Sequence, residues 1–161
     1  MSDTQEAARL AVRLDLGLAT LAEVAAFVDR SVAAASHVDG PLLDCCGIAE
    51  LPRDEIALRL IALVSADPMI GAALAVVATC DEWEGGRVEL ERAVDYVATW
   101  SARLPEQLAF DAMQIPSWIE DARAAIGYVT WADVAVYFRR LAHDCRVHAS
   151  LDSSGPRPRL R

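Results

Sequence analysis

The chain has 161 residues, a formal net charge of −9 and a sequence pI near 4.7. This length is typical of one domain with its own hydrophobic core, and the negative charge disfavours nucleic acids and anionic membrane surfaces as partners. All fifteen cationic side chains are arginine, so chemistry that depends on lysine, such as a Schiff base or a P-loop, is excluded.

The cysteines and the N-terminal residues predict the compartment. The first ten residues include charged side chains and no continuous apolar run, unlike a signal peptide. The longest apolar stretch, residues 69–80, is too short to span a bilayer. The cysteines suggest no disulfide framework; they are Cys45, Cys46, Cys80 and Cys145. We therefore expect a soluble, cytoplasmic bacterial protein with reduced thiols.

Two helices are predicted in the first 35 residues. The first covers residues 4–16 and ends at Gly17, which can adopt the left-handed conformation of a C-terminal cap. Thr20 and Glu23 form a Thr-x-x-Glu capping box, which predicts the start of a second helix that ends near Ala35.

The middle of the chain contains the most apolar segment. Pro41 can begin a short helix that Gly47 closes, and a longer helix follows Leu51. Residues 67–68, Asp-Pro, then begin a helix whose body, residues 69–78, is apolar on every side. A helix with no polar face is best explained as a central helix that its neighbours surround.

Further helices are predicted to the end of the chain. One covers residues 87–103, Pro105 and Pro116 open two shorter helices, and the last runs from Thr130 to about His148. Residues 153–161 form a basic tail rich in proline and serine, which predicts flexibility.

The predicted fold class is all-α, a compact helical bundle of about six to eight helices. Residues 1–152 are expected to form a single helical domain that precedes the tail, 153–161. Residues 17–27 and 127–137 share glycine, threonine, acid and aromatic positions. They represent either two related helix-hairpins near the termini or two independent uses of one capping solution.

Several motifs lack the residue types or the spacing that would indicate a binding or catalytic site. The turn before Thr20 resembles a helix-turn-helix, but the following helix offers no side chains that read bases. His143, Cys145 and His148 lack zinc-site spacing, and the acids lack the pattern of a calcium loop. His37 and the pair Cys45–Cys46 do not form a recognisable pattern of a catalytic base and nucleophile. We expect no metal and no cofactor.

Two segments combine tryptophan with acids. Residues 81–84 place three carboxylates near the negative end of a helix dipole, against the local electrostatics, and tryptophan is a frequent anchor of interfaces. The segment is either a partner-binding patch or an acidic loop with its tryptophan packed on the core. The predicted partner-binding residues are Asp81, Glu82, Trp83, Glu84, Trp118, Glu120 and Asp121.

These observations favour binding over catalysis. The leading hypothesis is a protein-interaction module, most concretely an acidic immunity-type or adaptor protein that binds a basic protein partner. One alternative is an enzyme or small-molecule binder with a pocket between helices. Another is a structural subunit that self-associates into a homo-oligomer.

Overall fold

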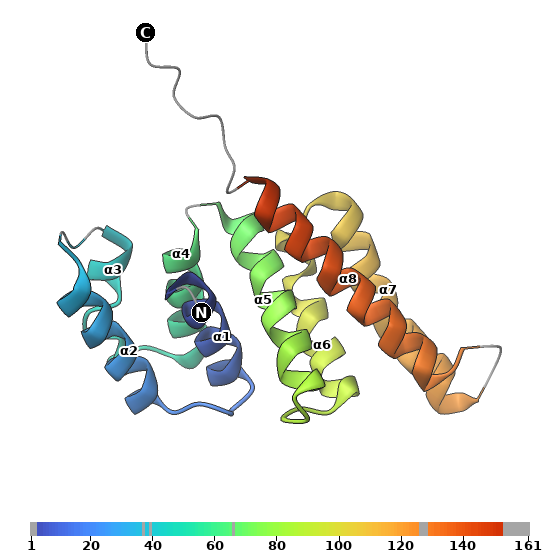
Figure 1. Cartoon of the computed structure of the whole chain (residues 1–161). Coiled ribbons are helices and arrows are strands. Elements are labelled where there is room, and N and C mark those ends of the chain that lie inside the picture. The colour runs from blue at the N-terminus through green and yellow to red at the C-terminus, as the bar shows by residue number, and fades with distance from the viewer. Residues whose placement is uncertain (1–2, 37, 39, 66, 126–128, 153–161) are drawn as a thin grey trace, which may run out of the picture. The chain divides into compact units, whose positions relative to one another are not determined.

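The computed structural model describes residues 3–36, 38, 40–65, 67–125 and 129–152, and the predicted tail at 153–161 lies outside them. Among these residues there are helices and no strand, so the predicted all-α fold class is confirmed (Figure 1). The helices are α1 (Asp3–Asp15), α2 (Leu21–Ala34), α3 (Gly40–Asp44), α4 (Arg53–Val64), α5 (Pro68–Glu84), α6 (Leu90–Trp100), α7 (Glu106–Ala124) and α8 (Trp131–Asp152), with short 3-10 turns η1 (Ile48–Glu50) and η2 (Ser101–Arg103).

The chain divides into two compact units, residues 1–71 and residues 72–161. The assignment of residues 1–152 to a single domain stays a prediction. None of the described helices is, by itself, both long and apolar enough to cross a membrane.

In the first unit, α1 packs along α4, and α2 contacts α1, α3 and η1. Most of the inward face of α1 is made of small and aliphatic side chains that are almost fully removed from solvent. The core residues of this unit include Ala7, Ala11, Val12, Leu14, Val24, Ile56 and Leu60. The helical periodicity of these residues therefore matches the face that each helix buries.

The predicted caps are present. Gly17 has φ +70°, which suits glycine because that conformation crowds a Cβ atom. Thr20 Oγ1 accepts from Glu23 N at 3.3 Å, while Glu23 Oε2 accepts from Thr20 N at 2.7 Å. Thr130 and Asp133 form the same reciprocal pair at the start of α8. These hydrogen bonds lower the pKa of both carboxyl groups. Gly127 of the second predicted hairpin lies outside the described residues.

The helix predicted over 69–78 forms the body of α5, and the second unit begins within it at Ala72. Ala72, Ala75 and Val76 are completely buried, whereas Met69 at the beginning of the helix is 42% exposed. In the second unit α6 packs on α7, and α7 packs on α8. The absence of a polar face correctly indicated the buried part of α5.

Pro105 opens a helix as predicted, since it is the N-cap of α7, but the separate short helix predicted from Pro116 is wrong, because α7 continues without a break past Pro116. An internal proline costs a helix about 3 kcal/mol through its missing N–H and the clash of its ring. The buried residues on both sides of Pro116 form one stripe, and the stripe outweighs this cost: Leu108, Ala112, Ile115 and Ile119.

The beginning of α6 also differs from the prediction, since the helix starts at Leu90 rather than at Arg87. Gly86 has φ +67°, and the N–H of Arg87 donates to the carbonyl of Glu82 at 3.0 Å. Arg87 therefore belongs to the C-terminal cap of α5.

Gly71, in the first turn of α5, lies very close to α4. A Cβ atom at this position would lie 2.6 Å from the Cγ2 atom of Ile61. We expect Gly71→Ala to lower the free energy of unfolding by about 1–2 kcal/mol, because overpacking outweighs the gain in helix propensity. Urea denaturation measures the change. The double variant Gly71→Ala/Ile61→Leu removes the branching methyl group and should recover stability; a Gly71→Ala variant as stable as the natural chain would contradict the close approach.

Candidate functional site

The first predicted segment, residues 81–84, forms the last turn of α5. Its three carboxylates differ in environment: the side chain of Glu82 is fully buried, whereas those of Asp81 and Glu84 are about half exposed. The 3.6-residue period of the helix explains this difference, because Glu82 points to the face that the unit buries.

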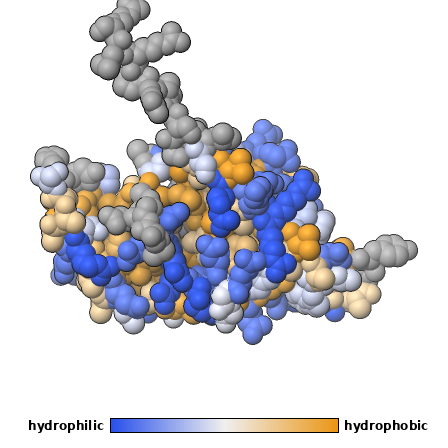
Figure 2. Space-filling model, in the orientation of Figure 1, coloured by the Kyte–Doolittle hydropathy of each residue, from blue (hydrophilic) through white to orange (hydrophobic). Residues whose placement is uncertain are grey.

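Each carboxylate of this turn binds an arginine of the same chain. The pairs are Glu82 Oε2 with Arg87 Nε at 2.5 Å, Glu84 Oε1 with Arg139 Nε at 2.6 Å, and Asp81 Oδ1 with Arg146 Nη2 at 3.3 Å. Two of the arginines belong to α8, and Figure 2 shows hydrophilic side chains along much of that helix. The placement of acids at the negative end of α5 is therefore compensated within the chain.

Trp83 packs on the core rather than projecting from it. Its ring centroid lies 5.5 Å from that of Phe138, and the guanidinium carbon of Arg139 lies 4.8 Å from the same ring. This arrangement agrees with the alternative interpretation of the segment, an acidic turn with its tryptophan folded back. Glu82 offers no surface to a partner, and a binding role for Asp81, Trp83 and Glu84 stays a prediction.

The second predicted segment lies on α7. Trp118 is half-buried, and its ring centroid lies 4.4 Å from that of Tyr137. The hydroxyl of Tyr137 donates to Asp111 Oδ1 at 2.9 Å, and burial raises the pKa of this tyrosine. Glu120 and Asp121 are exposed.

The two tryptophans contact different sides of α8. Trp83 packs on Phe138 and Trp118 packs on Tyr137. Consecutive residues of a helix point about 100° apart, since one turn contains about 3.6 residues. The predicted segments therefore reach α8 from two directions.

The outer face of α7 carries apolar side chains that the sequence analysis missed. Phe110 and Met113 are each 56% exposed, although both are large and apolar. Their spacing of three residues places them together on a helix surface. We define the outer face of α7 as six of its exposed residues that lie on one side of the helix: Glu106, Phe110, Met113, Ser117, Glu120 and Asp121. The sequence contained one indication of this exposure: Phe110 and Met113 do not lie on the helix face of the buried residues Leu108 and Ala112.

This outer face is acidic. Three of its six residues are carboxylates, and the single guanidinium of the helix belongs to Arg123. That guanidinium binds Glu91 of α6, and it lies 3.8 Å from Glu120. The apolar pair therefore lies between acidic groups at both ends of α7: Glu106 precedes it, and Glu120 and Asp121 follow it.

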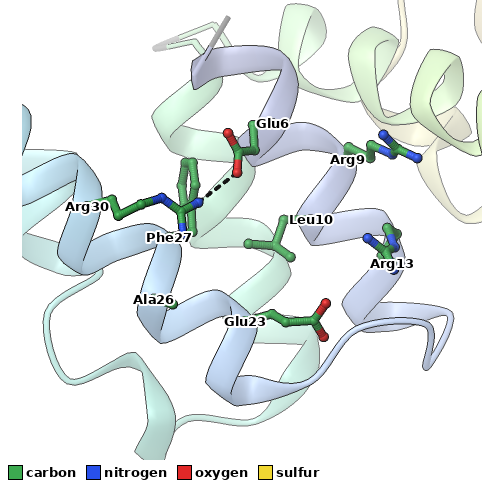
Figure 3. A pocket seen from close by; sticks show the side chains of 8 residues that line it. All are labelled: Glu6, Arg9, Leu10, Arg13, Glu23, Ala26, Phe27 and Arg30. Carbon is green, nitrogen blue, oxygen red and sulfur yellow. Dashed lines mark hydrogen bonds and ion pairs between the residues drawn. The ribbon is translucent and has the colours of Figure 1, made fainter. Parts of the chain in front are cut away.

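The first unit contains a pocket of about 300 Å³ between α1 and α2 (Figure 3). Arg30 of α2 binds Glu6 of α1 at 2.8 Å, and Leu10 and Phe27 lie between the two helices. The guanidinium of Arg9 extends away from α2 in this view. The charged groups around the pocket therefore do not converge on one point, and they form no reactive arrangement.

A second hollow, of about 360 Å³, lies between α2 and residues 45–48. Its lining is mostly apolar, and Cys45 there is buried, which raises the pKa of its thiol to about 11. A thiol with this pKa is a poor nucleophile at neutral pH. His37, the base considered with it, lies outside the described residues.

No group of three or more histidine, cysteine or acidic side chains in the described part of the chain could hold a metal ion. Comparison with family models, curated proteins and solved structures finds no match to this chain. The outer face of α7 is the candidate surface, because two large apolar side chains lie one turn apart on it and are each 56% exposed.

The four thiols should differ sharply in reactivity. Cys46 is exposed, whereas Cys45, Cys80 and Cys145 are buried and have pKa values raised to about 11 or 12 by burial. We expect an aromatic disulfide reagent at pH 8 to modify one thiol rapidly in the native protein and four after denaturation in urea. Cys46→Ser should abolish the rapid phase. Rapid modification of two or more thiols in the native chain would contradict this burial.

Proposed function

We propose that this chain is a protein-interaction module that binds a basic partner through the outer face of α7. The observation that carries the proposal is the exposure of Phe110 and Met113, 56% each, on one face of a helix with acids at both ends. Apolar side chains at the centre of a polar rim are the arrangement found in protein interfaces.

The apolar pair supplies binding free energy. Complete burial of a phenylalanine or methionine side chain contributes about 1.5–3 kcal/mol, and both side chains are already about half removed from water. The surrounding carboxylates add selectivity and faster association more than affinity. A partner with arginine or lysine around an apolar centre would satisfy both requirements.

A second copy of this chain is a poorer match to the same face. Each copy carries a net charge of −9, and the described acids of α7 would then face the acids of another α7. Juxtaposed like charges oppose association. This repulsion favours a different, basic protein over the self-associating subunit.

The finer form of the proposal is an immunity-type or adaptor protein. A small acidic protein that covers a basic site on its partner needs no catalytic groups of its own. Its charge would also accelerate association at low ionic strength.

The test is site-specific photo-cross-linking in the cells that produce the protein. A benzophenone amino acid at position 113 should capture a basic protein, and the same group at position 147, an exposed valine of α8, should not. Phe110→Ser should reduce the capture at position 113. Capture of a second copy of the chain, of an acidic protein, or of nothing would overturn the proposal.

A further inference from the structure

We infer that the part of the partner that lies on the outer face of α7 is a basic amphipathic helix. This inference rests on the proposed function and specifies the partner. It follows from three features of α7: the spacing of the apolar pair, the positions of the acids along the helix axis, and the fold class of the chain.

The spacing fits a second helix. Phe110 and Met113 lie one turn apart and form a single narrow ridge with Ser117 at the next turn. Ridges of this kind pack into the grooves of a facing helix at interaxial distances of about 8–10 Å. Anchors on the facing helix would recur at i, i+3 or i+4.

The acids set the distribution of charge on the partner. Glu106 lies one turn before Phe110, and Glu120 lies two turns after Met113. At about 1.5 Å per residue, the outer face from position 106 to position 121 is about 22 Å long. A helix of about four turns covers this length, with an apolar centre and a cation near each end.

Addition of a strand is the other common way to recognise a peptide, and it requires a free sheet edge. The described residues of this chain form helices only. Packing of one helix on another is therefore the recognition mode that the fold supports.

The experiment uses the full chain and a synthetic peptide of 18 residues as the probe. The peptide carries leucines at i, i+3 and i+4 spacing in its centre and lysines at both ends, and a matched control peptide carries glutamates in place of the lysines. The readout is the change of ¹⁵N-HSQC signals during titration. We expect the basic peptide to shift signals of residues 106–121 and the acidic control to shift none.

Two variants make the result specific. Phe110→Ser should weaken binding of the basic peptide at least tenfold, and Glu120→Lys/Asp121→Lys should weaken it further at low salt. Val147→Ser removes an exposed side chain of α8 and should leave binding unchanged. Equal binding to Phe110→Ser and to Val147→Ser would show non-specific attraction between charges, and it would overturn the inference.

The failure of this inference is distinguishable from the failure of the proposed function. Capture of a basic protein at position 113, with the cross-link mapped by mass spectrometry to a loop or a strand, would overturn only the helical partner. Absence of such a capture would remove both.

Discussion

Replacement of Arg87 by methionine is expected to lower the free energy of unfolding by about 3 kcal/mol, because it leaves the buried carboxylate of Glu82 without this cation. The Glu82 side chain has no exposed surface, and its Oε2 lies 2.5 Å from Arg87 Nε. The Arg87 side chain is itself 40% exposed, so water can replace part of its effect, and the lower end of the range for buried pairs applies. Urea denaturation at neutral pH measures the loss.

Two controls separate this effect from a general loss of arginine. Arg146→Met removes the partner of Asp81 in an ion pair whose two side chains are more than half exposed, and it should cost no more than about 1 kcal/mol. The double variant Glu82→Met/Arg87→Met removes the buried carboxylate together with its cation and should recover most of the loss. Equal destabilisation by the two single arginine variants would show that the burial of Glu82 has no special effect.

Local chemistry made most of the helix boundaries predictable. The Thr20 capping box and the glycine after α1 act over a few residues, so the sequence alone specifies them. The burial of α5 was equally predictable, because a helix without a polar face has to be covered by other parts of the chain. These features depend on neighbours in sequence and on simple periodicity.

The misplaced break at Pro116 has a different origin. The local preference of proline is to end a helix, and it was overridden by the packing of Ile115 and Ile119, which are buried on either side of it. That packing depends on the tertiary fold, so a rule based on neighbouring residues alone cannot predict that the helix continues.

The candidate site was only partly predictable for the same reason. The acids of residues 81–84 were identified, but the arginines that bind Asp81 and Glu84 lie 65 and 55 residues later in the chain. Sequence spacing cannot show which of several arginines comes close in space. The segment of α7 was found through Trp118, whereas Phe110 was recognised only from the exposure of its side chain in the structure.

Phe138→Ala is expected to lower the free energy of unfolding by about 3–5 kcal/mol, since it creates a cavity in the core of the second unit. Phe138 is completely buried and packs on Trp83 at a centroid distance of 5.5 Å. Removal of its ring also removes the contact with Trp83, which lies in the same turn of α5 as Glu82. Thermal and urea unfolding should report the same direction of change.

Phe110→Ala is the matched control, because it removes the same atoms from a site that is 56% exposed. It should lower the free energy of unfolding by no more than about 1 kcal/mol, because only about half of the side chain is removed from water. A phenylalanine that contributes so little to folding and yet remains on the surface requires another explanation, and the proposed interface supplies one. If Phe110→Ala were as destabilising as Phe138→Ala, Phe110 would be a structural residue, and the outer face of α7 would lose its claim to be a binding surface.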